Sequence, residues 1–257
     1  RILMDSEKDK TALPKKNKKS LGRRVIRFVD NLIDKAVFLI CLILFILGTY
    51  GLYDSYMVYQ QATDDSILKY KPGYKTDDAT NKEIKENMVA WITVDNTSID
   101  YPVMQGKDNN EYLNKDPFGD YSLSGSIFLD SRNDPDFKDY YSLVYGHHME
   151  QGMMFGALDD YLKKDYFDSH RSGTLTVGDT KYKLRFFAVL ECDATESSIF
   201  APTENDDETL DFIKQNALFL DDDAIPTEDE KILGLSTCKY PDTVERTLIF
   251  AAMLPES

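Results

Sequence analysis

From Ala90 onward the sequence contains eight short apolar runs separated by polar turns. Each run has the length of a β-strand, and together they leave little room for long helices between them. Eight short strands in one domain predict a closed or nearly closed β-barrel, because closure removes unpaired strand edges. The runs are residues 91–94, 100–104, 126–129, 141–145, 173–177, 181–190, 231–235 and 247–253.

Helices are expected on the N-terminal side of this barrel and at two places within it. Residues 54–70 continue a preceding helix until Lys71-Pro72-Gly73 breaks it, and residues 77–88 form a short helix. We predict a further helix over residues 152–162, and another over residues 204–220, inserted before the last two strands. The predicted fold is therefore mostly β, with N-terminal helices and a helical insertion.

An uncharged segment divides the chain into two parts of opposite charge. Residues 36–53 contain no charged side chain and are long enough to cross a bilayer. Residues 1–53 carry 11 Lys and Arg against 5 Asp and Glu, whereas the remainder carries 19 against 40. Since basic flanks stay inside, we expect a single span with the N-terminus in the cytoplasm and the acidic part outside. Membrane lipid is then a partner of the chain.

Two other interpretations of residues 36–53 remain, a cleaved signal peptide and a buried core helix. No small-residue cleavage site follows the run, and the lysine-rich flank does not suit a core helix. The predicted organisation is a basic cytoplasmic tail (1–35), a transmembrane anchor (36–53), a helical linker (54–89) and the barrel (90–257). The chain starts at Arg1, ahead of Met4, which leaves open whether residues 1–3 are native. The acidic outer part argues against nucleic-acid binding, because it has no basic surface to neutralise phosphates.

Three residue types suited to thiol chemistry stand at strand ends. Cys238 closes the motif Leu-Ser-Thr-Cys after one apolar strand, and Arg246 opens the next strand eight positions later. His147 follows Gly146 at the end of the strand 141–145. A thiolate is a nucleophile, an imidazole can give and take the proton of an amine, and a fixed cation can hold a carbonyl or an oxyanion. The combination predicts an acyl-transfer site.

The motifs around these residues resemble those of the sortases, the cysteine transpeptidases of Gram-positive cell surfaces. Leu-Ser-Thr-Cys followed by Arg, with Tyr-Gly-His upstream, is similar to the sortase pattern. Details resemble class B, and the resemblance covers about residues 90–253. The class B segments are Tyr-Pro-Val-Met-Gln-Gly at 101–106, Gly-Ser-Ile-Phe-Leu-Asp at 125–130, Gly-His-His-Met at 146–149 and Met-Phe at 154–155.

The resemblance implies a sortase-type eight-stranded barrel and assigns roles to the three residues. Cys238 is expected to attack the carbonyl after Thr in the C-terminal sorting signal of a secreted protein, Arg246 to orient that carbonyl, and His147 to act as acid and base. His147 is preferred over His148 because the family pattern places the catalytic histidine directly after Gly. The thioacyl enzyme is then released by an amine of peptidoglycan or its precursor. No cofactor is expected, because one peptide bond replaces another.

Four residues are expected to contact the substrate peptide. Ser236 shares a strand face with Cys238, and Met104 resembles a groove position for an apolar residue of the signal. Residues 194–200 are expected to form a loop beside the groove. The predicted substrate-binding residues are Met104, Ser236, Thr237 and Ile199.

Several alternatives stay open at this point. Cys192 is expected to be a small buried thiol, although a disulfide with Cys238 is possible in an oxidising compartment. The acidic runs at 206–207 and 221–223 lack calcium-loop spacing, so no metal site is expected. Rival functions are a pilin-polymerising sortase, a cysteine peptidase and a non-catalytic surface-binding barrel. The pilin-polymerising function ranks lower because the sequence ends at Ser257 without a second hydrophobic run.

Overall fold

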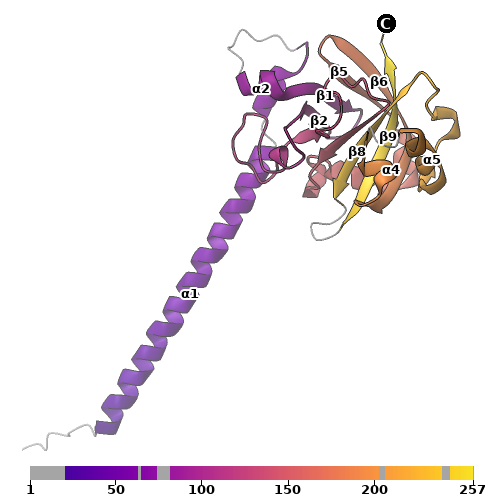
Figure 1. Cartoon of the computed structure of the whole chain (residues 1–257). Coiled ribbons are helices and arrows are strands. Elements are labelled where there is room, and N and C mark those ends of the chain that lie inside the picture. The colour runs from indigo at the N-terminus through magenta and orange to yellow at the C-terminus, as the bar shows by residue number, and fades with distance from the viewer. Residues whose placement is uncertain (1–20, 63–64, 74–81, 203–205, 239–243, 257) are drawn as a thin grey trace, which may run out of the picture. The chain divides into compact units, whose positions relative to one another are not determined.

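The computed structural model describes residues 21–62, 65–73, 82–202, 206–238 and 244–256. The chain divides into two compact units, Arg1–Asp54 and Ser55–Ser257, which are described separately. In the first unit the described residues belong to a single helix, α1 (Leu21–Ala62), whose last residues lie in the second unit (Figure 1).

Helix α1 contains the predicted uncharged segment, 36–53, and extends it at both ends. Its apolar side chains are exposed; Phe38, for example, is 70% exposed. Within the described part of the chain, this is the one helix that is long and apolar enough to cross a membrane. A span of 18 residues at 1.5 Å per residue covers roughly the 30 Å of a hydrocarbon core. The helix therefore suits a membrane anchor or a signal sequence.

The second unit is built on one sheet that closes on itself (Figure 1). Nine strands of the described chain lie in the order β5-β1-β2-β3-β4-β8-β9-β6-β7, and β5 also pairs with β6. That additional pairing closes eight strands into a barrel and leaves β7 outside, on the edge of β6. The predicted eight-stranded barrel is confirmed. The strands are β1 (Met88–Val94), β2 (Asp100–Met104), β3 (Ile127–Leu129), β4 (Tyr141–Gly146), β5 (Ser172–Val177), β6 (Thr180–Asp193), β7 (Phe219–Leu220), β8 (Lys231–Cys238) and β9 (Glu245–Pro255).

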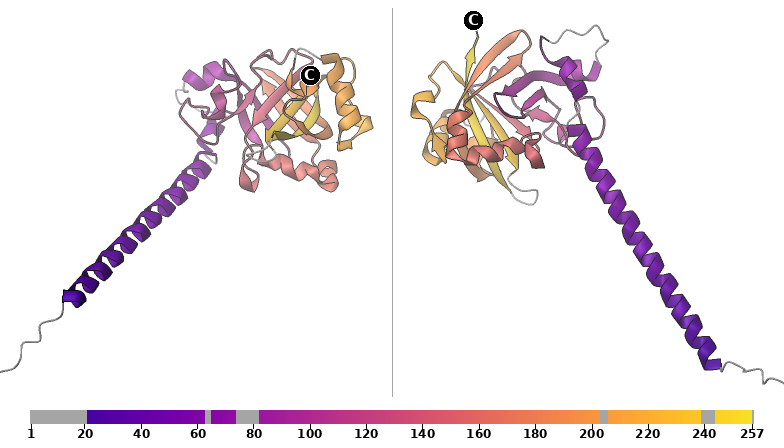
Figure 2. Two further views of the ribbon diagram at one scale, coloured as in Figure 1. Left: turned by 60° about the horizontal axis from the view of Figure 1, so that its bottom comes forward. Right: turned by 180° about the vertical axis from the view of Figure 1, so that it is seen from behind.

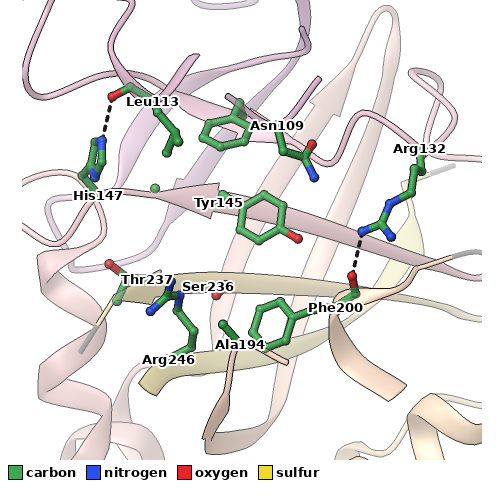
Figure 3. Close-up of a pocket in the computed structure, with 12 residues that line it drawn as sticks. Asn109, Leu113, Arg132, Tyr145, His147, Ala194, Phe200, Ser236, Thr237 and Arg246 are labelled. Atoms are coloured by element: carbon green, nitrogen blue, oxygen red, sulfur yellow. Dashed lines mark hydrogen bonds between the residues drawn. The ribbon is translucent and has the colours of Figure 1, made fainter. Parts of the chain in front are cut away.

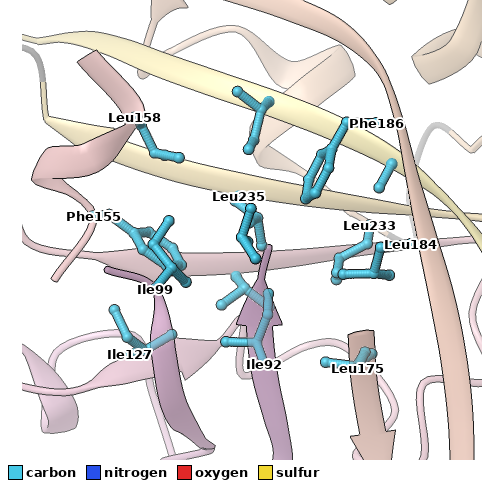
Figure 4. Packing of buried hydrophobic residues seen from close by; sticks show 14 of the residues in the cluster. Ile92, Ile99, Ile127, Phe155, Leu158, Leu175, Leu184, Phe186, Leu233 and Leu235 are labelled. Atoms are coloured by element: carbon cyan, nitrogen blue, oxygen red, sulfur yellow. The ribbon is translucent and has the colours of Figure 1, made fainter. Parts of the chain in front are cut away.

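Strand β4, residues 186–190 of β6, residues 232–235 of β8 and residues 248–253 of β9 are buried on both faces, which explains why these stretches are almost continuously apolar. One face contributes to an inner core within the barrel, and Figure 4 shows part of it. The other face contributes to an outer core beneath the helical insertion. Inner-core residues of these strands include Val144, Phe186, Leu233, Leu235 and Ile249. Outer-core residues include Leu143, Leu190, Ile232, Leu248 and Phe250.

The segment after β4 is helical but differs from the α-helix predicted over residues 152–162. It forms two 3₁₀ stretches, η3 (Glu150–Gly152) and η4 (Gly156–Leu162), followed by the helix α3 (Lys164–Ser169). Gln151 and Met154 adopt positive φ, so a continuous α-helix is interrupted there. Phe155, Leu158 and Tyr161 of this segment are part of the inner core. Figure 2 shows the segment lying along one side of the barrel.

The insertion between β6 and β8 contains more than the single helix predicted over residues 204–220. A short helix, α4 (Ser197–Phe200), precedes the main helix α5 (Asp206–Asn216), and residues 203–205 are outside the described part. Helix α5 ends before Leu218, whose N–H donates to the carbonyl of Val189 on β6. Phe219 and Leu220 then pair with β6 as β7. Phe219 and Leu220 therefore form hydrogen bonds with the edge of β6, whereas the sequence pattern alone assigned them to the helix.

The described part of the predicted helical linker contains two short helices after the end of α1. A 3₁₀ helix, η1 (Asp65–Tyr70), follows α1, and α2 (Lys82–Asn87) ends where β1 begins at Met88; residues 74–81 lie outside the described part. Lys71, in the predicted break, forms an ion pair of 2.7 Å with Asp100 on β2. The same carboxylate accepts hydrogen bonds from Trp91 Nε1 and Thr93 Oγ1 on β1. Asp100 therefore fastens the linker to the barrel.

Candidate active site

The three residues expected to carry the chemistry come from three neighbouring strands. Strand β8 lies between β4, which is parallel to it, and β9, which is antiparallel. Gly146 at the end of β4 pairs with Thr237, so His147 and Cys238 each follow one residue after this pair. Cys238 in turn pairs with Arg246 on β9. The sheet thus brings the three backbone positions to one end of three adjacent strands.

Gly146 is required by the packing beneath the site. A Cβ at this position would lie 2.7 Å from the ring of Phe155 and closer still to Cδ1 of Ile127, both of which belong to the inner core. Carbon atoms in contact normally stay about 3.5–4.0 Å apart. Only glycine therefore lets β4 approach this core while the following residue, His147, reaches the site.

The imidazole of His147 is held by the main chain. Its Nε2 lies 2.7 Å from the carbonyl oxygen of Leu113, at the end of the 3₁₀ helix η2 (Glu111–Leu113). A carbonyl oxygen can only accept, so Nε2 carries the proton and Nδ1 is the other ring nitrogen. The neighbouring His148 instead pairs through Nε2 with Asp159, at 2.7 Å.

Arg246 lies between two cysteine positions in the sheet, Cys238 on β8 and Cys192 on β6. Two strand spacings separate these cysteines by about 10 Å, more than the roughly 7 Å that a disulfide can bridge. Cys192 is a free thiol, so the alternative of a disulfide with Cys238 was wrong. Burial, with the nearby Glu196 and Asp193, raises the pKa of Cys192 to about 12, which keeps this thiol protonated and unreactive.

A pocket of about 310 Å³ opens at this end of the strands (Figure 3). In Figure 3, His147 and Arg246 lie on either side of the strand end that carries Ser236 and Thr237. The pocket is lined by Asn109, Leu113, Phe128, Arg132, Tyr145, Gly146, His147, Ala194, Phe200, Ser236, Thr237 and Arg246.

The residues predicted to bind substrate fall into two groups. Ser236 and Thr237 line the pocket, are each 1% exposed, and have hydroxyl groups without a hydrogen-bond partner in the described part of the chain. Met104 and Ile199 are fully buried and do not line it. Met104 packs in a small cluster with Phe128, one layer behind the wall, and Ile199 belongs to the outer core. Their substrate role stays a prediction.

Sequence reasoning missed the wall of the pocket formed by Asn109, Arg132 and Tyr145. Asn109, Arg132 and Tyr145 come from three separate segments and meet around the buried carboxylate of Asp130. One available signal was the two-residue period of β4, which places Tyr145 on the same side as His147. Nothing in the local sequence indicated Asn109 or Arg132, because each reaches the pocket from a loop.

Comparison with known proteins now bears directly on this arrangement. A family model described as the sortase domain matches residues 92–254, which is more than half of the chain. The chain belongs to the sortase family. The matched residues include the three strand ends and every residue that lines the pocket.

Relatives of this sortase place it in class B. Sortase B of Staphylococcus aureus is 30% identical over 207 residues, covering 79% of this chain and 85% of that protein. A solved Streptococcus pyogenes class B sortase involved in pilus biogenesis is 38% identical with a TM-score of 0.60, covering 66% of this chain and 94% of that one. The S. aureus sortase B–substrate complex is 29% identical with a TM-score of 0.63, covering 82% and 100%.

The class B assignment fixes the kind of enzyme. This sortase is a cysteine transpeptidase with a sortase barrel, so the alternative of a non-catalytic surface-binding barrel is set aside. Sortase B of Listeria monocytogenes, 34% identical over 168 residues that cover 64% of this chain and 68% of that protein, agrees with the assignment.

Proposed function

We propose that this sortase cleaves the C-terminal sorting signal of secreted proteins after a Thr residue and joins the new carboxyl end to an amine of the cell wall. The sulfur of Cys238 attacks the Thr carbonyl carbon, a C–S bond forms, and the C–N bond breaks as the amine leaves. The acceptor amine then attacks the thioester, forms a new C–N bond and releases the thiolate. One amide replaces another, and no net oxidation or reduction occurs.

The observation that carries this proposal is the register of β4, β8 and β9. Cys238 is the direct pair of Arg246 and lies one residue beyond the Gly146–Thr237 pair that precedes His147. Backbones paired in this way are about 4.5–5.5 Å apart, so the nucleophile, the cation and the imidazole can meet one carbonyl group. The pocket beside them provides a place for the peptide.

Arg246 is proposed to bind the carbonyl oxygen under attack. A guanidinium presents several N–H donors in a planar fork, and its charge stabilises the oxyanion that develops in the tetrahedral intermediate. The side chain is half-buried, which limits competition from water. One of its nitrogens, Nη1, donates to the carbonyl of Glu245 at 3.1 Å, and this contact fixes the orientation of the side chain.

His147 is proposed to give a proton to the leaving amine and to take one from the incoming amine. In the observed pose Nε2–H donates to Leu113, so Nδ1 is the nitrogen that exchanges protons. The hydrogen bond to Leu113 persists in both charge states of the ring and is stronger when the ring is charged. The Leu113 carbonyl therefore holds the imidazolium in place during the reaction.

A second candidate function is polymerisation of pilin subunits. Among the similar structures, the one from S. pyogenes is a class B sortase involved in pilus biogenesis, at 38% identity, and another is sortase B from the type II pilus of Streptococcus pneumoniae, at 32%. Both functions share cleavage of a sorting signal, and they differ in the acceptor. The acceptor is a wall amine in one case and a lysine side chain of another subunit in the other.

Product analysis separates these functions from simple peptidase activity. The full chain in detergent is incubated with a library of sorting-signal peptides, alone and with a wall-type amine or a pilin-type lysine peptide. We expect cleavage after Thr and a new amide to the wall-type amine, identified by mass spectrometry. Transfer only to the lysine peptide would favour pilin polymerisation, and release of free acid in the presence of both amines would identify a peptidase.

We also propose that α1 anchors the enzyme with its N-terminus inside, following the organisation predicted from the sequence. The positive charge of residues 1–35 and the acidic character of the part after residue 53 support this orientation. Protease added to cells without a wall should digest the catalytic domain and leave a small N-terminal piece. Survival of the domain until the membrane is permeabilised would contradict the orientation.

A further inference from the structure

Asp130 is a buried carboxylate behind the pocket wall that Asn109, Arg132 and Tyr145 form. It directly follows β3, and its side chain is 0% exposed. Its Oδ1 accepts from the main-chain N–H of Arg132 at 3.0 Å and from Arg132 Nε at 2.9 Å. Its Oδ2 accepts from Arg132 Nη2 at 2.8 Å, from the Tyr145 hydroxyl at 2.9 Å and from Asn109 Nδ2 at 2.9 Å. A carboxylate that is buried away from water needs hydrogen-bond donors to offset the loss of its hydration. These five hydrogen bonds supply them to Asp130.

The three residues that donate to Asp130 all line the pocket. Asn109 is fixed at both ends of its amide, because its Oδ1 also accepts from the N–H of Ser131 at 2.7 Å. The ring of Tyr145 packs against that of Phe128, which also lines the pocket, with the centroids 5.3 Å apart and the planes tilted by 35°. Asp130 therefore decides where the polar groups of this wall lie and which way they are directed.

Arg132 extends this network to the helical insertion. Besides its contacts with Asp130, its Nη2 donates to the carbonyl oxygen of Phe200 at 2.7 Å, as Figure 3 shows. Phe200 ends α4 and lines the pocket from the other side. One guanidinium thus joins the wall formed after β3 to the wall formed by the insertion.

We propose that Asp130 and Arg132 are the positioning residues of the peptide groove: Asp130 orients Asn109 and Tyr145, and Arg132 holds α4 at the distance that an extended peptide requires. This inference rests on the proposed function, because it concerns the same pocket. The pair acts on binding of the peptide and not on bond making, since neither residue lies on the paired ends of β4, β8 and β9 that hold the three proposed reacting residues. The lowered pKa of Asp130, caused by its hydrogen bonds to Arg132, Tyr145 and Asn109 against the opposing effect of burial, supports an ionised hub.

The deciding variant is Arg132→Lys. The side chain of Arg132 is 39% exposed, so we expect the fold to tolerate the substitution. A lysine, however, cannot bridge both oxygens of Asp130 and the carbonyl of Phe200. Arg185→Lys is a matched control: Arg185 is 36% exposed, donates to the carboxylate of Glu230 and to the carbonyl of Ala224, and does not line the pocket.

Four quantities are measured on the full chain in detergent. They are kcat and KM for a sorting-signal peptide, the rate at which Cys238 reacts with a small thiol reagent, and hydrogen exchange of the main chain at α4. For Arg132→Lys we expect KM to rise about tenfold, kcat to change less than about threefold, thiol reactivity to stay unchanged, and exchange at α4 to increase. Arg185→Lys should leave all of them unchanged.

Each other result overturns the proposal. An unchanged KM would mean that Arg132 does not position the groove, and an equal rise in KM for Arg185→Lys would point to a general loss of stability. A parallel fall in kcat and thiol reactivity would place the effect at Cys238. If the wild-type chain reacts with the reagent but cleaves no sorting-signal peptide, the proposed function fails. In that case hydrogen exchange at α4 still tests whether Arg132 positions this helix. If exchange at α4 does not increase in Arg132→Lys, the positioning role is refuted.

Discussion

Cys238 and Arg246 face each other as direct partners across the antiparallel strands β8 and β9. Residues opposite each other in such a pair have Cα atoms about 4.5–5.5 Å apart. The backbone positions of the proposed nucleophile and of the proposed cation are therefore neighbours in the sheet. The parallel pairing of β8 with β4 places the residue after Gly146, His147, at the same end of the sheet.

Replacing Cys238 by Ala should abolish cleavage of a sorting-signal peptide and leave the fold intact. The proposed nucleophile is lost, whereas removing one sulfur atom costs at most about 1–2 kcal/mol, less than the stability of a typical domain. Activity and thermal unfolding are measured on the same preparation. Cleavage by the folded variant would refute the mechanism.

The matched control for this variant is Cys192→Ala, on the next strand but one. Because the pKa of Cys192 is raised to about 12, its thiol should remain unmodified by iodoacetamide at pH 7.5. Mass-spectrometric mapping should find rapid modification at Cys238 and full activity in Cys192→Ala. Rapid modification of Cys192 instead would contradict the assignment of a protonated, buried thiol.

Replacing Arg246 by Lys should lower kcat by about a hundredfold, although the charge is kept. A lysine offers a compact ammonium group and not a planar fork, so it cannot hold the substrate carbonyl in the same geometry. Steady-state kinetics with a sorting-signal peptide measure the effect. Near wild-type turnover would make Arg246 a structural cation.

His147→Ala should be inactive, and His148→Ala should retain most activity. Only His147 lines the pocket, whereas His148 pairs with the partly exposed Asp159, a contact worth about 1 kcal/mol at most. Both variants are compared in one peptide-cleavage assay, with thermal unfolding as a check on folding. The reverse pattern of activities would transfer the acid–base role to His148.

Much of the fold follows from the sequence because its signals are local. All eight predicted strands are present, and the stretches that face two cores, such as residues 186–190 of β6 and 248–253 of β9, are the continuously apolar ones. The segments whose secondary structure was predicted wrongly are those in which contacts with another part of the chain, or an unusual backbone conformation, determine the local structure. Residues 219–220 form a strand because the edge of β6 is available to them, and residues 152–162 lose their α-helix where Met154 adopts positive φ.

The candidate site divides in the same way. Cys238, Arg246 and His147 could be named from the sequence because each ends a strand, and strand register brings the ends together. Asn109 and Arg132 could not, because loops carry them and a buried carboxylate gathers them. Met104 and Ile199 are buried and are not among the residues that line the pocket, so their proposed contact with substrate stays a prediction.

Gly146→Ala should lower both stability and activity. The new methyl group would meet the ring of Phe155 at 2.7 Å and would lie closer still to Cδ1 of Ile127, an overpacking that costs about 1–3 kcal/mol. The strain also moves His147, the next residue. Adding Ile127→Val removes Cδ1 and should recover part of the melting temperature. No recovery in the double variant would show that the clash with Ile127 is not the cause.

The stabilising effect of Asp130 should depend on pH in a predictable direction. Hydrogen bonds to its charged form lower its pKa below the ordinary value, so its contribution to stability is present above about pH 4 and is lost as the pH falls through the lowered pKa. The difference in melting temperature between wild type and Asp130→Asn should therefore be large at pH 7 and shrink below pH 4.

Asp116→Asn supplies a control of the opposite sign. Burial raises the pKa of Asp116, so its protonated form suits the folded state better than its charged form does. That contribution is present below the unfolded pKa and is lost as the pH rises through the raised pKa. The wild-type advantage over Asp116→Asn should thus grow as the pH falls, while the advantage over Asp130→Asn shrinks. Parallel curves for the two variants would mean that acid acts elsewhere in the protein and that Asp130 is not held ionised by its donors.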